Sequence, residues 1–122
     1  GMAKSDFEKK LLIAVDYGLL ALGENNRTAI YYHLEKSFRL EREKISNNPE
    51  EFSQALHSIF GPGAEVIEKF IIKDLYSRLG LNFEEETSSE FIDCVRRAQK
   101  NLGSQTRSFI GNIKMKRGGK FE

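Results

Sequence analysis

The sequence has no tryptophan, only two prolines and a single cysteine among its 122 residues. One thiol cannot close an internal disulfide, and Cys94 on its own is typical of a protein from a reducing, cytoplasmic setting. Two prolines leave most of the chain free to be helical. No apolar run approaches the roughly 18 residues that a membrane-spanning helix requires. The single cysteine excludes a disulfide framework. The few prolines and the lack of a long apolar run favour a helical protein without a membrane span.

What the sequence does contain is a mixture of apolar and charged residues. The hydrophobic share of 39% and the charged share of 30% are typical of one globular domain with a modest core. The net charge of +1 hides an uneven distribution, because residues 91–122 carry eight basic and two acidic side chains. A short acidic stretch precedes them, with Glu84, Glu85, Glu86 and Glu90. The sequence therefore predicts a near-neutral body with a basic end.

The first predicted helix begins at a capping box. Ser5 can accept a hydrogen bond from the first helical turn, and Glu8 can reach back to the backbone of Ser5. The apolar residues from Leu11 to Leu22 nearly encircle the helix axis, which predicts a central, buried helix. Gly23 is expected to end it, since glycine readily adopts the left-handed conformation found after helices.

A second helix is predicted from about residue 27 to residue 38, with an asparagine at position 25 or 26 as its N-cap. Its apolar stripe is Ile30, Leu34 and Phe38. The segment that follows has two interpretations. It either prolongs the helix or forms a connector that buries the apolar side chains of Leu40 and Ile45 in the core.

The clearest helix start is Asn48-Pro49, where Asn48 is the expected N-cap and Pro49 occupies the first turn. This third helix runs to the stop Gly61-Pro62-Gly63, and a fourth helix extends from about residue 64 to residue 79, with Gly80 as the stop after it. The fourth helix is predicted to turn these side chains toward the core: Ile67, Phe70, Ile71, Asp74, Leu75 and Leu79. The glycines are not expected to bind phosphate, because Glu65 stands where such a loop carries a lysine.

A fifth helix is predicted from about residue 88 to residue 102, from the capping box at 87–90 and a narrow apolar stripe. The patterns together predict an all-α fold, a compact four- to five-helix orthogonal array or bundle with the first and fourth helices as its central pair. We expect residues 1–103 to form the helical domain. Residues 104–122, the basic tail, are expected to pack on the domain or on a partner subunit.

Catalytic and metal-binding patterns are not found. His33 and His57 have no His or Cys three or four residues away, so the sequence predicts no metal site and no other cofactor. Cys94 has cationic neighbours but no general base close to it in the sequence, which favours an unreactive helix-face cysteine. No catalytic residues are therefore predicted, and we expect that the protein is not an enzyme.

A polar pocket between helices is the alternative that an enzyme or ligand-binding domain would require. Asp16 lies in a mostly apolar helical face, and with Tyr17 and His33 it forms a candidate set for such a pocket. Acids in this position more often serve as hydrogen-bonded links between two helices. We favour the linking role.

The basic side chains near the end of the sequence are candidate contacts for nucleic acid or for an acidic protein surface. They are Arg96, Arg97, Lys100, Arg107, Lys114, Lys116 and Arg117. A pI near 8.0 is low for a nucleic-acid-binding domain, and charged runs are frequently just solvated. Binding to nucleic acid is therefore the alternative hypothesis, behind a protein partner.

Several motifs between Phe7 and Gly80 resemble a family of small helical domains of archaeal proteins, which are described as signal-transduction output domains. The residues that carry the resemblance are Phe7-Glu8-Lys9-Lys10-Leu11-Leu12, Asp16-Tyr17-Gly18-Leu19, Leu22-Gly23-Glu24, Ala29-Ile30-Tyr31-Tyr32-His33-Leu34-Glu35, Phe52, Leu56, Ile59-Phe60-Gly61, Gly63-Ala64, Leu75-Tyr76 and Leu79-Gly80. The resemblance implies a common fold and a role in signal transduction, and it brings no catalytic residues. It covers about three-fifths of the chain and leaves out the fifth helix and the basic tail.

The first hypothesis is a non-enzymatic regulatory module of the cytoplasm that binds another protein. A homodimer is expected, because the apolar stripes of the first and fourth helices look wide for so few covering helices. The second hypothesis is a nucleic-acid-binding regulator that uses the fifth helix and the basic tail.

Overall fold

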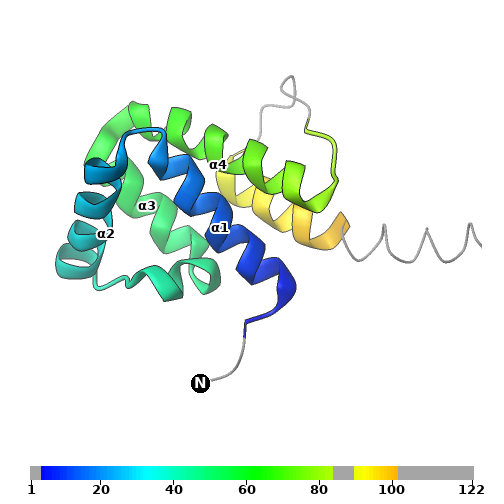
Figure 1. Cartoon of the computed structure of the whole chain (residues 1–122), viewed down its shortest axis with the longest axis horizontal. Helices are drawn as coiled ribbons and strands as arrows, with labels where there is room; N and C mark the ends of the chain where they lie inside the picture. The colour runs from blue at the N-terminus through cyan, green and yellow to red at the C-terminus, as the bar shows by residue number, and fades with distance from the viewer. Residues whose placement is uncertain (1–3, 84–89, 102–122) are drawn as a thin grey trace, which may run out of the picture.

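The computed structural model describes residues 4–83 and 90–101, and all regular structure within these ranges is helical (Figure 1). The α-helices are α1 (Asp6–Leu20), α2 (Glu24–Phe38), α3 (Pro49–Phe60) and α4 (Ala64–Leu79). A 3-10 helix, η1 (Arg42–Asn47), joins α2 to α3, and a second, η2 (Gly61–Gly63), joins α3 to α4. Residues 91–101 form a further helix, called here the 91–101 helix. The predicted compact all-α fold is confirmed.

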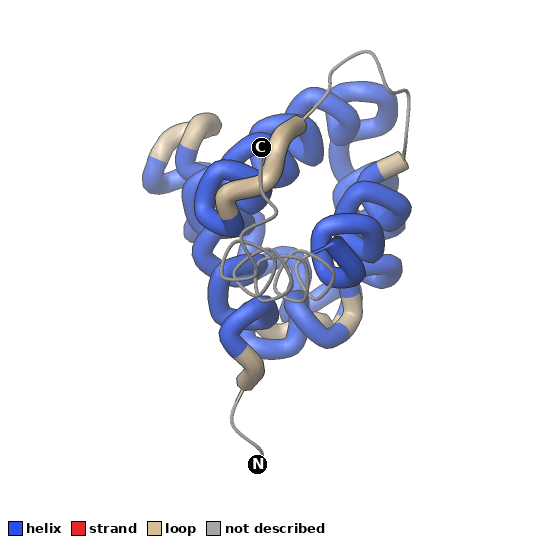
Figure 2. The backbone as a smooth tube through the Cα atoms, turned by 90° about the vertical axis from the view of Figure 1, so that its right-hand side faces the viewer, coloured by secondary structure: helices blue, strands red, loops and turns tan. Residues whose placement is uncertain are grey.

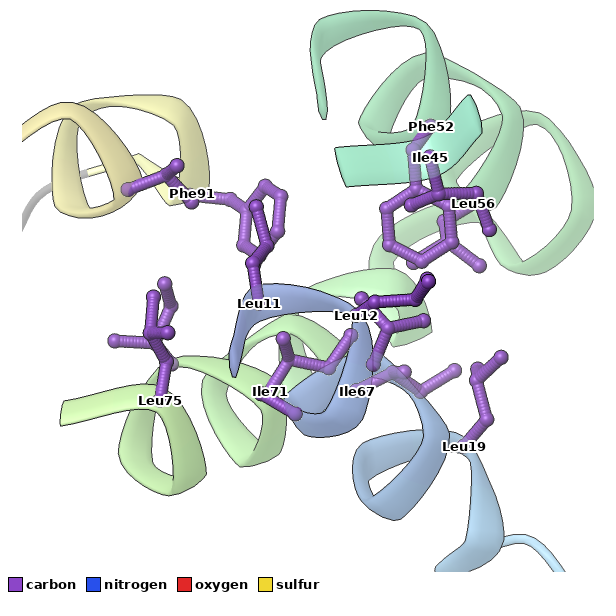
Figure 3. Packing of buried hydrophobic residues seen from close by; sticks show 14 of the residues in the cluster. Leu11, Leu12, Leu19, Ile45, Phe52, Leu56, Ile67, Ile71, Leu75 and Phe91 are labelled. Carbon is purple, nitrogen blue, oxygen red and sulfur yellow. The ribbon is translucent and has the colours of Figure 1, made fainter. Parts of the chain in front are cut away.

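The centre of the fold is the pair formed by α1 and α4, as the sequence predicted. The two helices run in opposite directions, because Leu11 lies toward the Leu75 end of α4 and Leu19 toward the Ile67 end (Figure 3). Gly18 makes this close approach possible. A Cβ atom added there would stand only 2.3 Å from Cγ1 of Ile71.

The other helices cover this pair and complete the core. Phe52 and Leu56 of α3, Ile45 of η1 and Phe91 of the 91–101 helix surround the side chains of α1 and α4 (Figure 3). The rings of Phe52 and Phe91 pack at a centroid distance of 6.1 Å, so two segments far apart in the sequence meet in the core. In the second view the helical segments enclose a common interior (Figure 2). Burial of each such side chain contributes about 2 kcal/mol.

The starts of the first two helices show one correct and one wrong prediction. The capping box of α1 is confirmed, since Ser5 Oγ accepts from the Glu8 N–H at 3.1 Å and Glu8 Oε1 accepts from the Ser5 N–H at 3.1 Å. The predicted start of α2 near residue 27 is wrong. Gly23, with a φ of 103°, is its N-cap, and the Arg27 N–H already donates to the Gly23 carbonyl. Asn26 does not cap the helix because its side-chain amide donates backward to the Leu22 carbonyl.

The segment between α2 and α3 is a connector and does not prolong α2, which agrees with the second of the two interpretations offered for it above. Leu40 and Ile45 are almost completely buried, and Arg39 leaves α2 in the left-handed conformation with a φ of 54°. Pro49 occupies the first turn of α3 as predicted, but Asn48 makes no capping bond. Asn48 is nevertheless the N-cap residue of α3, because its carbonyl accepts from the Phe52 N–H at 3.0 Å, while its side-chain amide donates to the Lys44 carbonyl.

The helix ends at Gly61 and Gly80 are confirmed, since both glycines have a positive φ. Phe70 was predicted to face the core, and that prediction is wrong, because its side chain is exposed. The 91–101 helix begins after Glu90 rather than near residue 88, and it buries Phe91, Val95 and Ala98 as predicted.

The remaining predictions for the end of the chain lie outside the described residues. These are the capping positions at 87–89, the last residue of the predicted fifth helix and the basic tail. Among the described residues, no helix combines the length and the apolar character that crossing a bilayer requires.

Candidate functional site

A broad groove of about 980 Å³ lies between α3, α4 and the 91–101 helix. We call it the acidic groove. Its walls follow from helical periodicity: α3 contributes Glu50, Ser53, Gln54 and His57, and α4 contributes Glu65, Glu68, Lys69 and Ile72. Both sets have the spacing i, i+3, i+4, i+7, so each is one face of its helix. The third wall consists of the first turn of the 91–101 helix together with Phe83 and Glu90.

Glu68 lies in this groove and is 6% exposed. Its carboxylate has two partners on α3. Ser53 Oγ donates to Oε2 at 2.5 Å, and His57 Nε2 lies 3.1 Å from Oε1. A buried carboxylate requires such partners, because the loss of its hydration is costly. The three side chains thus tie α3 to α4 across the groove.

The direction of these bonds bears on catalysis. Activation of a serine nucleophile needs the hydroxyl to donate to a general base, which in a Ser–His pair is the imidazole. Here the Ser53 hydroxyl donates to Glu68, and His57 contacts the other oxygen of the same carboxylate. The carboxylate is therefore the shared acceptor, so these bonds do not form a Ser–His pair, and both of them stabilise Glu68 in its buried position.

The acidic groove combines negative charge with an apolar lining. Among the residues that the structure describes, five acidic side chains face it against one lysine: Glu50, Glu65, Glu68, Glu90, Asp93 and Lys69. Ile72, Phe83, Phe91 and Ile92 supply apolar surface. Arg96 pairs with Glu50 at 2.9 Å between exposed side chains, so one cation of the 91–101 helix already lies against a wall of this groove. The arrangement suits a ligand that carries positive charge and apolar groups together.

Asp16 links three elements, as the favoured interpretation predicted. Arg42 of η1 donates to Asp16 Oδ1 through Nε at 3.0 Å and to Oδ2 through Nη2 at 2.5 Å. The hydroxyl of Tyr31 on α2 also donates to Oδ1. Burial acts to raise the pKa of Asp16, but the hydrogen bonds from Arg42 and Tyr31 outweigh it and lower the pKa below its usual value. The same contact and burial raise the pKa of Tyr31.

The other two members of the predicted polar pocket lie elsewhere. The Tyr17 ring is exposed, with the guanidinium of Arg78 stacked 4.7 Å from its centroid. His33 contacts Ser37 on its own helix at 3.2 Å and packs edge-on against Phe38. The structure joins Asp16 to Tyr31 and Arg42, and brings neither Tyr17 nor His33 into that cluster.

His33 instead borders a small apolar hollow of about 360 Å³ between α2 and the end of α3. Leu22, Ile30, Ile59 and Phe60 form most of its surface, with Asn26 and Ala29 at the side. Its lining offers few polar groups that could fix the orientation of a ligand.

Four exposed apolar side chains define what we call the α1–α4 face: Ile13 and Tyr17 of α1 with Val66 and Phe70 of α4. Their exposed fractions range from 38% for Ile13 to 58% for Val66. Each pair is spaced i, i+4 along its helix, so its members are neighbours. The stacking of Arg78 on Tyr17 shows that the Tyr17 end of this set lies beside α4.

The candidate contacts on the 91–101 helix are Arg96, Arg97 and Lys100, and all three are exposed. Arg107, Lys114, Lys116 and Arg117 lie outside the described residues. Cys94 is buried, and burial raises the pKa of its thiol, which agrees with an unreactive cysteine. Among residues 4–83 and 90–101, no three His, Cys, Asp or Glu side chains lie together in a way that could hold a metal ion.

Glu68 was not singled out from the sequence, although a signal for it exists. Ala64 and Ile72 stand four residues before and after it on α4, and both are buried. An acid in the middle of such a stripe must face the protein interior. Its partners Ser53 and His57 are also four residues apart, on the facing side of α3.

Comparison with known proteins gives no match: no family model, no curated protein and no solved structure is similar to this chain. The resemblance to archaeal output domains, and the role in signal transduction that it implies, stay predictions.

Proposed function

We propose that the protein is a non-enzymatic regulatory module that acts by binding another protein, and that its partner through the α1–α4 face is a second copy of the chain. The observation that carries this proposal is the exposure of Ile13, Tyr17, Val66 and Phe70 on the two helices that form the centre of the fold. Exposed apolar side chains on neighbouring helices mark candidate protein–protein contact sites.

The chemistry of this face supports a protein partner. Tyr17 and Phe70 are aromatic, and aromatic side chains contribute much of the binding energy at protein interfaces. The ion pair of Arg78 with Asp74, at 2.5 Å, lies on the same stripe of α4 and supplies polar groups beside the apolar ones. An apolar centre beside charged side chains is the usual anatomy of an interface.

The hydrogen bonds within the two polar clusters, around Asp16 and around Glu68, support the same proposal. Asp16 is held by Arg42 and Tyr31, and Glu68 is held by Ser53 and His57. Both clusters join one helix to another. Their geometry is that of structural links rather than of groups held ready for a substrate.

Sedimentation equilibrium of the full chain between 1 and ~100 micromolar tests self-association, a range that brackets weak and moderate dimers. We expect a dimer that dissociates on dilution. The variant Phe70→Glu should weaken the dimer at least about tenfold, because it places a charge in an apolar contact.

The matched control is Tyr32→Glu, since Tyr32 is exposed on α2 and away from this face. It should leave the dissociation constant unchanged. A clean monomer at every concentration, or equal effects of the two variants, would refute self-association through the α1–α4 face.

Binding to nucleic acid is the second candidate, and the exposure of Arg96, Arg97 and Lys100 favours it. It requires affinity for mixed DNA or RNA that falls steeply with salt concentration. The acidic groove disfavours it, because Arg96 pairs with Glu50 at the wall of that groove and the carboxylates there repel phosphates. Fluorescence anisotropy with labelled oligonucleotides at 50 and 200 millimolar salt, about the range where counterion release is large, decides between the two.

A further inference from the structure

We propose that the acidic groove is the docking site of the chain's own basic tail, residues 104–122. This surface is different from the α1–α4 face, and the proposal does not depend on self-association. It rests on the shape and charge of the groove, on the composition of the tail and on where the described chain ends.

The charges of the two parts are complementary. Within residues 4–83 and 90–101, the groove presents five acidic side chains and one lysine, and one of the five, Glu50, already pairs with Arg96. The tail carries five basic side chains and one acidic side chain: Arg107, Lys114, Lys116, Arg117, Lys120 and Glu122. Opposite charges attract each other over about one Debye length, so the basic tail is attracted to the acidic groove. The acidic side chains of the groove also disfavour an acidic occupant.

The apolar groups of the two parts are complementary as well. Phe109, Ile110, Ile113 and Met115 are interspersed among the basic residues of the tail. The groove offers apolar surface from Ile72, Phe83, Phe91 and Ile92 between its acidic walls. A segment that bore only charge would not need these apolar positions. The pairing of apolar groups adds specificity to a contact that charge alone would leave loose.

The length of the chain permits the contact. The 91–101 helix has its first turn at the groove, and its last residue is about 15 Å further along the helix axis. Nineteen residues in extended form reach about 60 Å. The tail can therefore turn back and reach the groove of the same molecule. Arg96, which already pairs with Glu50, shows that a cation from this part of the chain fits beside a wall of the groove.

The first test is zero-length carbodiimide cross-linking of the full chain followed by mass spectrometry. This reagent joins only a carboxylate and an amine that are in contact. We expect links from Lys114, Lys116 or Lys120 to Glu65, Glu90 or Asp93. A mixture of isotope-labelled and unlabelled chains distinguishes the arrangements: links within one chain support the proposal, and links found only between chains overturn it.

The second test is the rate at which trypsin cleaves the tail of the folded protein after its lysines and arginines. The groove variant Glu65→Lys/Asp93→Lys reverses two exposed charges. It should accelerate cleavage about three- to tenfold, since each exposed ion pair is weak and several act together. The double variant Glu35→Lys/Glu41→Lys is the matched control, because it changes net charge equally at exposed sites outside the groove.

A charge exchange keeps the proposal falsifiable if the groove variant loses stability. Adding Lys114→Glu/Lys116→Glu to the groove variant restores opposite charges, and cleavage at Arg107, which is distant from both substitutions in the sequence, should return toward the rate of the unmodified chain. Circular dichroism of each variant reports folding independently. Equal cleavage rates in the groove variant and its control, or an absence of rescue, would show that the tail does not dock in this groove.

Discussion

The close approach of α1 and α4 depends on Gly18, and the substitution Gly18→Ala tests whether the packing or the helix propensity dominates there. In an open helix this change stabilises a protein by about 1 kcal/mol, because glycine is the more flexible residue in the unfolded chain. Gly18 lies in the interior of α1 and is buried. Whether Gly18→Ala raises or lowers the free energy of unfolding therefore depends on how closely the neighbouring helix α4 packs against this position.

The structure leaves no room for the added methyl group. It would stand 2.3 Å from Cγ1, 3.2 Å from the backbone nitrogen and 3.3 Å from Cα of Ile71. Ile71 is completely buried, so its side chain cannot swing aside, and the backbone atoms move only if α4 moves. Overpacking of this kind costs about 1–3 kcal/mol. With the gain in propensity subtracted, we expect Gly18→Ala to lower the free energy of unfolding by roughly 0–2 kcal/mol.

Urea denaturation followed by circular dichroism measures this free energy by linear extrapolation. Ala29→Gly at an exposed position of α2 is the control for propensity, and it should cost about 0.5–1 kcal/mol. In the background of Ile71→Ala the clash with Cγ1 is absent. Gly18→Ala should then cost less than in the unmodified protein, because only the backbone contacts at 3.2 and 3.3 Å remain, and the coupling energy between the two positions should reach up to about 3 kcal/mol. A stabilising effect of Gly18→Ala in the unmodified protein would refute the argument from packing.

Three further predictions follow from buried or bonded side chains. Because the folded pKa of Asp16 is lowered, its ionised form stabilises the fold above about pH 4, and this contribution is lost as the pH falls through the folded pKa. Asp16→Asn should remove that part of the acid dependence and cost about 1–3 kcal/mol at pH 7, measured by urea denaturation across pH. The buried hydroxyl of Ser46 finds no partner within the described part of the chain, so Ser46→Ala should be neutral or should raise the unfolding free energy by up to about 1 kcal/mol. Cys94 should react with a disulfide reagent at least about tenfold more slowly in the folded protein than in urea, because it is buried and its pKa is raised.

Each of these predictions has a contradicting outcome. An unchanged pH profile in Asp16→Asn would mean that Arg42 and Tyr31 do not favour the charged carboxylate. A clear loss of stability in Ser46→Ala would reveal a partner for the hydroxyl. Equal rates for Cys94 with and without urea would place the thiol at the surface.

The candidate site was less predictable than the fold. Asp16 stood out because a carboxylate interrupts an apolar stripe, and its role as a link between helices agrees with the favoured interpretation. Its partner Arg42 could not be found from the sequence, because it comes from η1, 26 residues away. Glu68 was missed because α4 carries several acids, and only the packing of Ser53 and His57 against it sets it apart.

The sequence by itself determined the helices and most of their ends. The capping box at Ser5, the glycines at positions 61 and 80 and the apolar stripe of α1 act over a few residues, so local chemistry is enough to specify them. The same stripe also indicated that α1 and α4 form the central pair. These features need no knowledge of the partner helix beyond its being apolar.

Only the tertiary structure decided which side of each helix meets which neighbour. Phe70 fits the apolar pattern of α4 as well as Ile71 does. The missing Cβ of Gly18 lets α1 pack closely against Ile71, and in this orientation of α4 the side chain of Phe70 is exposed. The acidic groove likewise exists only where α3, α4 and the 91–101 helix come together. The physical reason is that helical periodicity fixes which residues share a face, whereas the direction in which that face points depends on close packing between segments distant in the sequence.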